Sequence, residues 1–258
     1  RVETNGNITE LDKVFAADKG ANDLYGSALA NSHELLVVGC KYHNTNGNPD
    51  QGAAYVYRIE PNGTAVFLHK LSASDGAGND YYGLSISLEG KYFAIGAPNA
   101  DSHAKTDSGA VYLYRHESNG SSTLLQKLTS PEPDSANDLF GYSLSQSGDL
   151  LSIGAYQANG KGANYLYRIE SNGSTTFLQK IAAPDGVASH YFGISNSISP
   201  KSLTVGATGA DPNGQTDAGA AYLFDLSTLP RSLPGDRDGD GFSDALEANA
   251  TTNPDSNL

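Results

Sequence analysis

The sequence predicts an all-β fold, a β-propeller of four-stranded antiparallel blades with four blades visible. The main observation is a repeated pattern: an aromatic-glycine pair, an apolar run that ends at glycine, and a tyrosine-rich segment. The pairs begin at Tyr25, Tyr82, Phe140 and Phe192, at spacings of 57, 58 and 52 residues. The closing glycines repeat these spacings at Gly39, Gly96, Gly154 and Gly206. Two ladders that agree in this way indicate an array of one repeated supersecondary unit.

Composition and charge support this fold class and narrow the partners. The 258 residues are 38% apolar and 17% charged, with 29 Gly and 15 Tyr, which is typical of many short strands joined by tight turns. A formal net charge of −13 disfavours nucleic acid and anionic membranes, because binding phosphates needs a surplus of Lys and Arg. No apolar run approaches the roughly 20 residues that span a membrane, so we expect no membrane insertion. No signal peptide is visible, so we interpret the chain as a mature form or as an excised part of a longer one. We expect a monomer, or one module of a longer chain.

The second copy shows how one repeat becomes four strands. Residues 84–88 alternate apolar and polar side chains, and 91–96 form an apolar run that suits a buried strand. Residues 110–115 and 122–128 are rich in strand-forming residues, and an Asn-Gly turn between them indicates a hairpin. Named A to D in order, four antiparallel strands with short connections make one propeller blade.

The two ends of the array are incomplete. Residues 1–7 match the turn between strands C and D in other copies, so 8–14 would be a strand D without a blade. The last copy ends after its strand C at 220–226. Two arrangements remain open: the N-terminal strand pairs with the last blade and closes the ring, which removes open edges, or the chain belongs to a larger propeller. We favour closure.

Two motifs carry a family resemblance. Residues 82–86, Tyr-Gly-Leu-Ser-Ile, followed by 94–98, Ala-Ile-Gly-Ala-Pro, resemble the FG-GAP repeat of integrin-α-type propellers. The recurring Asn-Asp-x-Tyr/Phe-Gly opening is similar to FG-GAP repeats of secreted bacterial proteins. The resemblance covers residues 1–230 and implies a propeller with an extracellular or cell-surface binding role, although a fold alone implies no ligand. The turns between strands A and B are short, so integrin-type calcium loops within the blades are not carried over.

The remaining residues, 231–258, contain a candidate metal site. Residues 236–247 read Asp-Arg-Asp-Gly-Asp-Gly-Phe-Ser-Asp-Ala-Leu-Glu, which places carboxylates on alternate residues and a glycine at the sharp turn, as a twelve-residue Ca²⁺ loop requires. The predicted ligands are Asp236, Asp238, Asp240, the Phe242 carbonyl, Asp244 and Glu247. An acidic linker is the alternative. The loop resembles a thrombospondin type 3 or dockerin-like calcium repeat with a short helix, which implies a calcium-stiffened spacer.

The long connections are the predicted ligand-binding face. In a propeller the D-to-A and B-to-C loops lie on one face, and here they are long and acidic. The Asn-Asp pairs recur in three copies, so we interpret them as turn caps that bond to their own backbone. A functional site is expected where the copies differ, although each such residue could be an ordinary exposed loop residue. The candidates are His190, Tyr191, Tyr156, His43, His103 and Lys105.

Motifs for catalysis are lacking, so we expect no enzyme. The sequence has neither a G-x-S-x-G nor an H-E-x-x-H motif. The single cysteine, Cys40, excludes an internal disulfide, and we interpret it as a small buried residue because the other copies carry alanine there. We expect an extracellular binding or adhesion module for a protein or glycan. The alternatives are a domain of a secreted polysaccharide-active enzyme, catalytic or accessory, and a structural spacer without a ligand.

Overall fold

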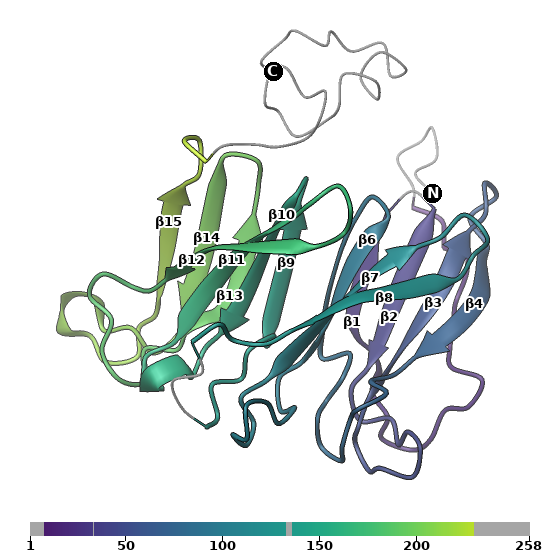
Figure 1. Ribbon diagram of the computed structural model, residues 1–258, viewed down its shortest axis with the longest axis horizontal. Helices are drawn as coiled ribbons and strands as arrows, with labels where there is room; N and C mark the ends of the chain where they lie inside the picture. The colour runs from purple at the N-terminus through teal and green to yellow at the C-terminus, as the bar shows by residue number, and fades with distance from the viewer. Residues whose placement is uncertain (1–7, 33, 133–135, 230–258) are drawn as a thin grey trace, which may run out of the picture.

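The chain forms four antiparallel β-sheets placed side by side (Figure 1). The structure, a computed structural model, describes residues 8–32, 34–132 and 136–229, and these ranges contain two short 3-10 turns, Ala158–Gly160 and Pro212–Gly214, besides the strands. Within them, no helix is long and apolar enough to cross a bilayer. The predicted all-β array of blades is therefore confirmed.

Each sheet is a meander in which consecutive strands pair. Sheet 1 contains β1 (Tyr25–Asn31), β2 (Leu35–Cys40), β3 (Ala53–Ile59) and β4 (Ala65–Leu71). Sheet 2 contains β5 (Ser85–Glu89), β6 (Tyr92–Ala97), β7 (Ala110–His116) and β8 (Ser122–Leu128). Sheet 3 contains β9 (Ser143–Ser147), β10 (Leu150–Ala155), β11 (Ala163–Ile169) and β12 (Thr175–Ile181). Sheet 4 contains β13 (Phe192–Ile198), β14 (Ser202–Ala207) and β15 (Ala220–Asp225).

The junctions between neighbouring sheets depend on the repeated glycines. The inner strands β1, β5, β9 and β13 contact one another in this order. A Cβ atom added to Gly96 would collide with the carbonyl oxygen of Gly141 in the next sheet, and the pairs Gly39–Gly83 and Gly154–Gly193 repeat this contact. The hydroxyl of Ser85 donates to the same Gly141 oxygen at 2.6 Å. Only glycine allows two backbones to approach so closely, which explains why the closing glycines recur.

The hydrophobic cores also lie at the junctions. Val56 and Leu68 of sheet 1 pack with Tyr82, Phe93 and Ile95 of sheet 2 in one cluster. Two further clusters join sheet 2 to sheet 3 and sheet 3 to sheet 4. Burial of apolar surface is the dominant favourable term in folding, so the array is held together where one sheet meets the next.

The two ends of the array each present half of such a junction. Leu223 on β15 is 74% exposed, whereas its counterpart Leu113 on β7 is 0% exposed. The three atoms nearest to a Cβ added to Gly206 all belong to Ser195 in its own sheet, and a Cβ added to Gly26 would have no described atom within 4 Å. These positions are repeat equivalents of the buried junction residues, but among the described residues nothing covers them.

Within residues 8–229, the predicted pairing of the N-terminal strand with the last blade is not seen. Residues 9–16 form no strand, and the sheet of β13, β14 and β15 has three strands within the described ranges. The carboxylate of Asp12 instead accepts a hydrogen bond from Ala65 N at 2.8 Å, in sheet 1. Leu11 lies against Gly63 in the turn between β3 and β4. One repeat later, Leu68 of β4 lies near Gly120 in the equivalent turn. The segment thus occupies the place of a strand D preceding sheet 1, and the described residues show no pairing between it and β15.

Candidate ligand-binding site

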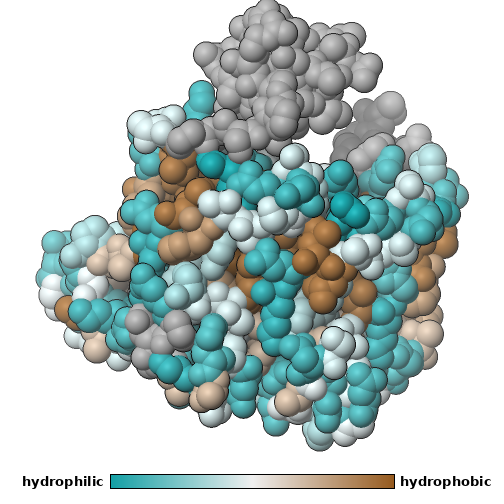
Figure 2. Space-filling view, viewed as in Figure 1, coloured by the Kyte–Doolittle hydropathy of each residue, from teal (hydrophilic) through white to brown (hydrophobic). Residues whose placement is uncertain are grey.

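The long loops lie together along the lower edge of the molecule in Figure 1, opposite the short turns. Figure 2 shows that this edge is predominantly hydrophilic. The recurring aspartates at the ends of the D-to-A loops, Asp23, Asp80 and Asp138, are buried. The carboxylate of Asp80 accepts a hydrogen bond from Ala77 N at 2.8 Å, and that of Asp23 accepts one from Gly20 N at 2.5 Å. These contacts agree with a capping role for the Asn-Asp pairs.

The residue that follows each of these aspartates has a left-handed backbone, and so does the residue that follows His190 in the fourth copy. The values of φ are 54° at Leu24, 57° at Tyr81, 58° at Leu139 and 57° at Tyr191. For bulky residues this conformation costs on the order of 1–3 kcal/mol and persists only where the surroundings impose it. Here the amides of Tyr81 and Leu139 bond to Asp50 O and Asp107 O of the preceding sheet, at 3.3 and 3.2 Å. The repeat therefore holds a variable, bulky side chain at the same place beside each junction.

Two of these side chains help to line a cavity of about 360 Å³ between sheets 1, 2 and 3. We call it the tyrosine hollow and define it by Tyr42, Tyr81, Tyr142, Tyr156, Asn99 and Gln157. Lys41 and Asp107 supply the charged groups among its described lining residues. The hollow is thus formed by loop residues of three sheets and offers aromatic rings, amides and hydroxyls.

The tyrosine rings contact one another edge to face, which fixes their positions. Ring centroids are 5.3 Å apart for Tyr42 and Tyr81, and 4.4 Å apart for Tyr142 and Tyr156. Tyr191 of sheet 4 adds a third ring to the pair of Tyr142 and Tyr156, with its ring centroid 5.7 Å from that of Tyr156. Edge-to-face pairs contribute about 0.5–1.5 kcal/mol beyond the buried area. The aromatic surface is therefore preorganised rather than assembled by a ligand.

The hydroxyl groups of two tyrosines in the hollow are uncharged at neutral pH. Burial raises the pKa of the Tyr81 and Tyr142 hydroxyls, so both remain protonated hydrogen-bond donors at neutral pH. Burial, and after it the charge of Asp101, raises the pKa of Asp107. The tyrosines and amides of the hollow are therefore neutral donors and acceptors that lie beside the charged groups Lys41 and Asp107.

The structure brings together some of the ligand candidates predicted from the sequence. Tyr156 and Tyr191 are in ring contact at the hollow. His190 is buried and takes the place of the recurring aspartate, with Val187 N at 3.5 Å from its Nδ1. His103 and Lys105 lie in the B-to-C loop of sheet 2, where His103 is exposed, but neither lines the hollow.

His43 is buried within the loops of sheet 1. Its Nδ1 lies 2.9 Å from Asp23 Oδ2, and its Nε2 lies 2.6 Å from Lys70 Nζ. Cys40 is fully buried beside it, as its interpretation as a small buried residue requires. Burial, reinforced by the charges of Asp23 and Asp18, raises the pKa of the Cys40 thiol to about 12. The thiol is therefore neutral and is not an activated nucleophile.

Sequence reasoning missed Tyr42, Tyr81 and Tyr142, although a signal for two of them exists. Tyr81 is the variable residue before an aromatic-glycine pair. Tyr42 aligns with Asn99, Gln157 and Gly209 in the other repeats, so it is a position at which the copies differ. The predicted calcium ligands, Asp236, Asp238, Asp240, Phe242, Asp244 and Glu247, lie outside the described residues.

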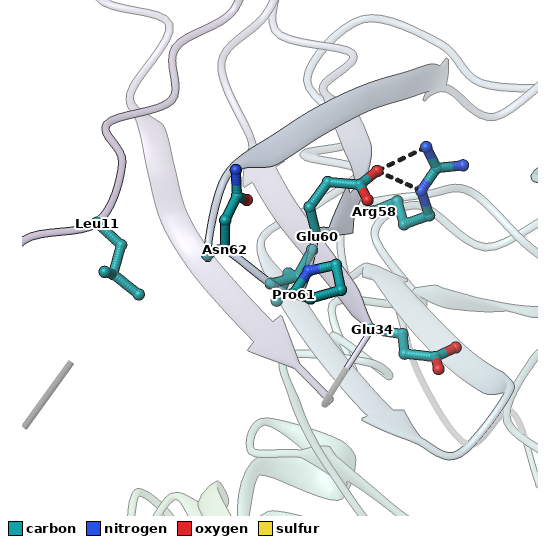
Figure 3. A pocket seen from close by; sticks show the side chains of 8 residues that line it. Leu11, Glu34, Arg58, Glu60, Pro61 and Asn62 are labelled. Carbon is teal, nitrogen blue, oxygen red and sulfur yellow. Dashed lines mark hydrogen bonds and ion pairs between the residues drawn. The ribbon is translucent and has the colours of Figure 1, made fainter.

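A larger cavity, of about 830 Å³, lies at the opposite edge (Figure 3). It opens between Leu11 and the turn that joins β3 to β4. Two of its charged groups are engaged with each other, because Arg58 Nη2 forms an ion pair of 2.6 Å with Glu60. Arg115 and Glu117 repeat this pair in sheet 2 at 2.8 Å. We therefore assign these side chains to the shared scaffold and place the candidate site at the hollow.

Similarity to known proteins identifies the repeat. The family model described as "FG-GAP repeat" matches residues 8–57, 66–114, 123–167 and 175–224. No curated protein matches the sequence. Among solved structures, Sqt1 of Saccharomyces cerevisiae is 15% identical, with a TM-score of 0.45 over 77% of this chain and 48% of Sqt1. A Lactobacillus plantarum protein, structural genomics target LpR118, is 14% identical, with a TM-score of 0.46 over 81% and 57% of the two chains. The chain thus spans about half the length of these structures.

Proposed function

Because this chain belongs to the FG-GAP repeat family, whose propellers commonly serve as ligand-binding modules, we propose that it is an extracellular module that binds a glycan in the tyrosine hollow. The extracellular location rests on the resemblance to secreted FG-GAP proteins. The observation that carries the ligand class is the lining itself: four tyrosine rings, with the Asn99 and Gln157 amides beside them.

A sugar matches this lining chemically. Its C–H faces pack on aromatic rings, and its hydroxyl groups exchange hydrogen bonds with amides and phenols, which both donate and accept. A cavity of about 360 Å³ is near the lower end of the range for small-ligand sites, roughly 300–1,000 Å³. It suits one or two sugar units of a longer chain. The net charge of −13 favours a neutral glycan over an anionic one.

A binding role fits the hollow better than catalysis. Hydrolysis of a glycosidic bond generally requires two facing carboxyl groups, whereas Asp107 is the one carboxylate among the described residues that line the hollow. We therefore keep the prediction that the chain is not an enzyme. Incubation with each glycan that binds, followed by an assay for new reducing ends, tests it, and product formation would refute it.

The direct test is a glycan array followed by calorimetry with the glycans that bind. Tyr156→Ala removes a central ring of the hollow and should weaken binding at least tenfold. Tyr92→Ala is the matched control, because Tyr92 lies at the short-turn end of β6, with its hydroxyl 3.3 Å from Ser171 O. Equal affinities for parent and Tyr156→Ala would refute the site. Binding to a basic peptide array but to no glycan would reassign the ligand as a protein.

We also propose that residues 236–247 bind Ca²⁺ and stiffen the segment after the propeller. Support comes from the sequence alone, in the alternate carboxylates and the glycine at the turn. FG-GAP repeats often bind calcium, and because the A-to-B turns of this chain are short, the site that we propose is in the tail instead.

A further inference from the structure

Sheet 1 differs from the other sheets at two buried positions, one at the end of β2 and one in the loop that follows it. Cys40 and His43 align with an alanine pair in each of the other repeats, namely Ala97 and Ala100, Ala155 and Ala158, and Ala207 and Ala210. In each repeat these alanines occupy the positions of Cys40 and His43, and all six are buried. The scaffold therefore folds with alanine at both positions, so packing alone does not demand a thiol and an imidazole there.

The two side chains meet a third potential metal ligand. One ligand atom from each of Asp23, Cys40 and His43 lies within 4.8 Å of the other two, and all three residues are buried. His43 Nδ1 is 2.9 Å from Asp23 Oδ2, and Cys40 Sγ is 3.3 Å from the Asp23 carbonyl oxygen. Sulfur, imidazole nitrogen and carboxylate oxygen are the three donors that zinc takes in proteins, at about 2.0–2.3 Å from the ion.

We propose that Cys40 Sγ, His43 Nδ1 and Asp23 Oδ2 bind a zinc ion that joins the D-to-A and B-to-C loops of sheet 1. Three protein ligands leave the fourth tetrahedral position to water. The mixed soft and hard donor set disfavours Ca²⁺ and Mg²⁺, which prefer oxygen ligands throughout. This site does not depend on the proposed glycan function.

The surrounding residues supply the second shell that such a site needs. Asp18 Oδ2 lies 3.5 Å from His43 Nε2 and 2.7 Å from Lys70 Nζ. On zinc binding, the thiol proton of Cys40 leaves to solvent, and the imidazole proton moves from Nδ1 to Nε2. Once the Lys70 ammonium, which lies 2.6 Å from Nε2 in the metal-free protein, shifts away, Nε2–H can donate to Asp18, which gives the carboxylate–histidine–metal arrangement that orients ligating histidines. Lys70 keeps its ion pair with Asp18.

The charges of the loaded cluster balance. Zinc and the Lys70 ammonium offset the Cys40 thiolate and the carboxylates of Asp18 and Asp23. Without zinc the network is also complete, because Nδ1–H can donate to Asp23 and Nε2 can accept from Lys70. The apo protein therefore folds, and zinc adds stability without being required for folding.

Sheet 2 shows the same group of residues with alanine in place of the cysteine and the histidine. Asp75, Lys127 and Tyr112 repeat the frame of Asp18, Lys70 and Tyr55, with distances of 2.6 and 2.8 Å from Asp75 to its two partners. Alanine at positions 97 and 100 leaves this frame without sulfur or imidazole donors. In sheet 1, Tyr42 of the hollow lies between the two proposed ligands in sequence, so the ion would also fix one wall of the hollow.

The test is titration of the full chain with Co²⁺ under reducing conditions. Parent protein should develop a thiolate-to-cobalt charge-transfer band, which Zn²⁺ abolishes by displacement. Cys40 is the only cysteine, so cobalt held by the acidic tail gives no such band. The double variant Cys40→Ala/His43→Ala carries the alanine pair of the other repeats and should fold, yet lose both the band and the rise in Tm that Zn²⁺ produces in the parent.

The variant Asp18→Asn tests the partner of His43 while leaving all three proposed zinc ligands in place. This variant should keep the band but bind about tenfold more weakly. Cobalt binding by the parent without a charge-transfer band would overturn the proposal. An equal rise in Tm on adding Zn²⁺ to the parent and to the double variant would overturn it as well.

Discussion

The junctions between sheets and the loops at the lower edge derive from the same repeat, yet the copies agree in one region and differ in the other. At the junctions, three copies place glycine against glycine, and Ser85 and Ser143 donate to the next sheet in the same way. In the loops, Tyr42 aligns with Asn99, Gln157 and Gly209.

This difference separates the two tasks of the molecule. A contact that must recur at every junction leaves little freedom for substitution, because a Cβ atom there would meet backbone rather than a movable side chain. The loops beyond it are held by backbone hydrogen bonds, which tolerate changes of side chain. We therefore expect substitutions at the junctions to reduce stability and substitutions in the loops to reduce binding.

The largest effect is expected from Gly96→Ala. The new methyl group would collide with the Gly141 carbonyl, so the free energy of unfolding should fall by about 3 kcal/mol. The matched variant is Gly206→Ala at the open end, where the added methyl meets the movable Ser195 hydroxyl and should cost less than about 1 kcal/mol. Chemical denaturation of both variants measures the difference. Equal losses would mean that the junction contact is not what requires glycine.

A similar difference is expected from Leu113→Ala and Leu223→Ala. Leu113 is fully buried at the junction of sheets 2 and 3, so its truncation should cost about 2–4 kcal/mol. Leu223 is its exposed counterpart on β15, and truncation there should change stability by about 0.5 kcal/mol or less. If Leu223→Ala cost as much as Leu113→Ala, β15 would have to be covered in solution.

A smaller effect should appear in acid. Burial raises the pKa of Asp75, but hydrogen bonds from Lys127 and Tyr112 outweigh it, so the folded pKa lies below the ordinary 3.8. The ionised form is thus favoured in the folded state, and its contribution is present above about pH 4 and is lost as pH falls. The side chain is 51% exposed, so the contribution is below about 1 kcal/mol. Stability of Asp75→Asn should depend less on pH between 4 and 2 than that of the parent.

The smallest effect on the propeller is expected from calcium. Asp240→Ala removes a central ligand of the predicted loop and should weaken Ca²⁺ binding at least tenfold in calorimetry, because each carboxylate contributes charge and coordination. The unfolding midpoint of the sheets should stay the same with calcium or with chelator. Parent-like Ca²⁺ affinity in this variant would show that the loop is assigned wrongly.

Much of the fold could be predicted from the sequence because the same pattern of strands and turns occurs in four copies. Predicted strands at 110–115 and 122–128 agree with β7 and β8 to within one residue. Ring closure could not be predicted, because it depends on the rotation from one sheet to the next, and no residue pattern encodes that angle. Hydrophobic alternation and turn residues predict a blade, whereas ring closure depends on the rotation angles summed over all junctions between sheets.

The candidate site was predictable only in part. Tyr156 and Tyr191 stood out because the copies differ there. Tyr42 and Tyr81 are 39 residues apart in the sequence, and only the packing of sheets 1 and 2 brings their rings together across the junction. The cluster of Cys40, His43 and Asp23 likewise depends on two loops of one sheet lying side by side.

The most direct test of the division between scaffold and loops is hydrogen exchange of the intact chain with and without a bound glycan. The tyrosine hollow predicts slower exchange at the amides near Tyr42, Tyr81 and Tyr156, with no change at the short turns near Glu60 and Glu117. Protection at the cavity beside Glu60, with none at the hollow, would contradict the account and place recognition on the opposite edge.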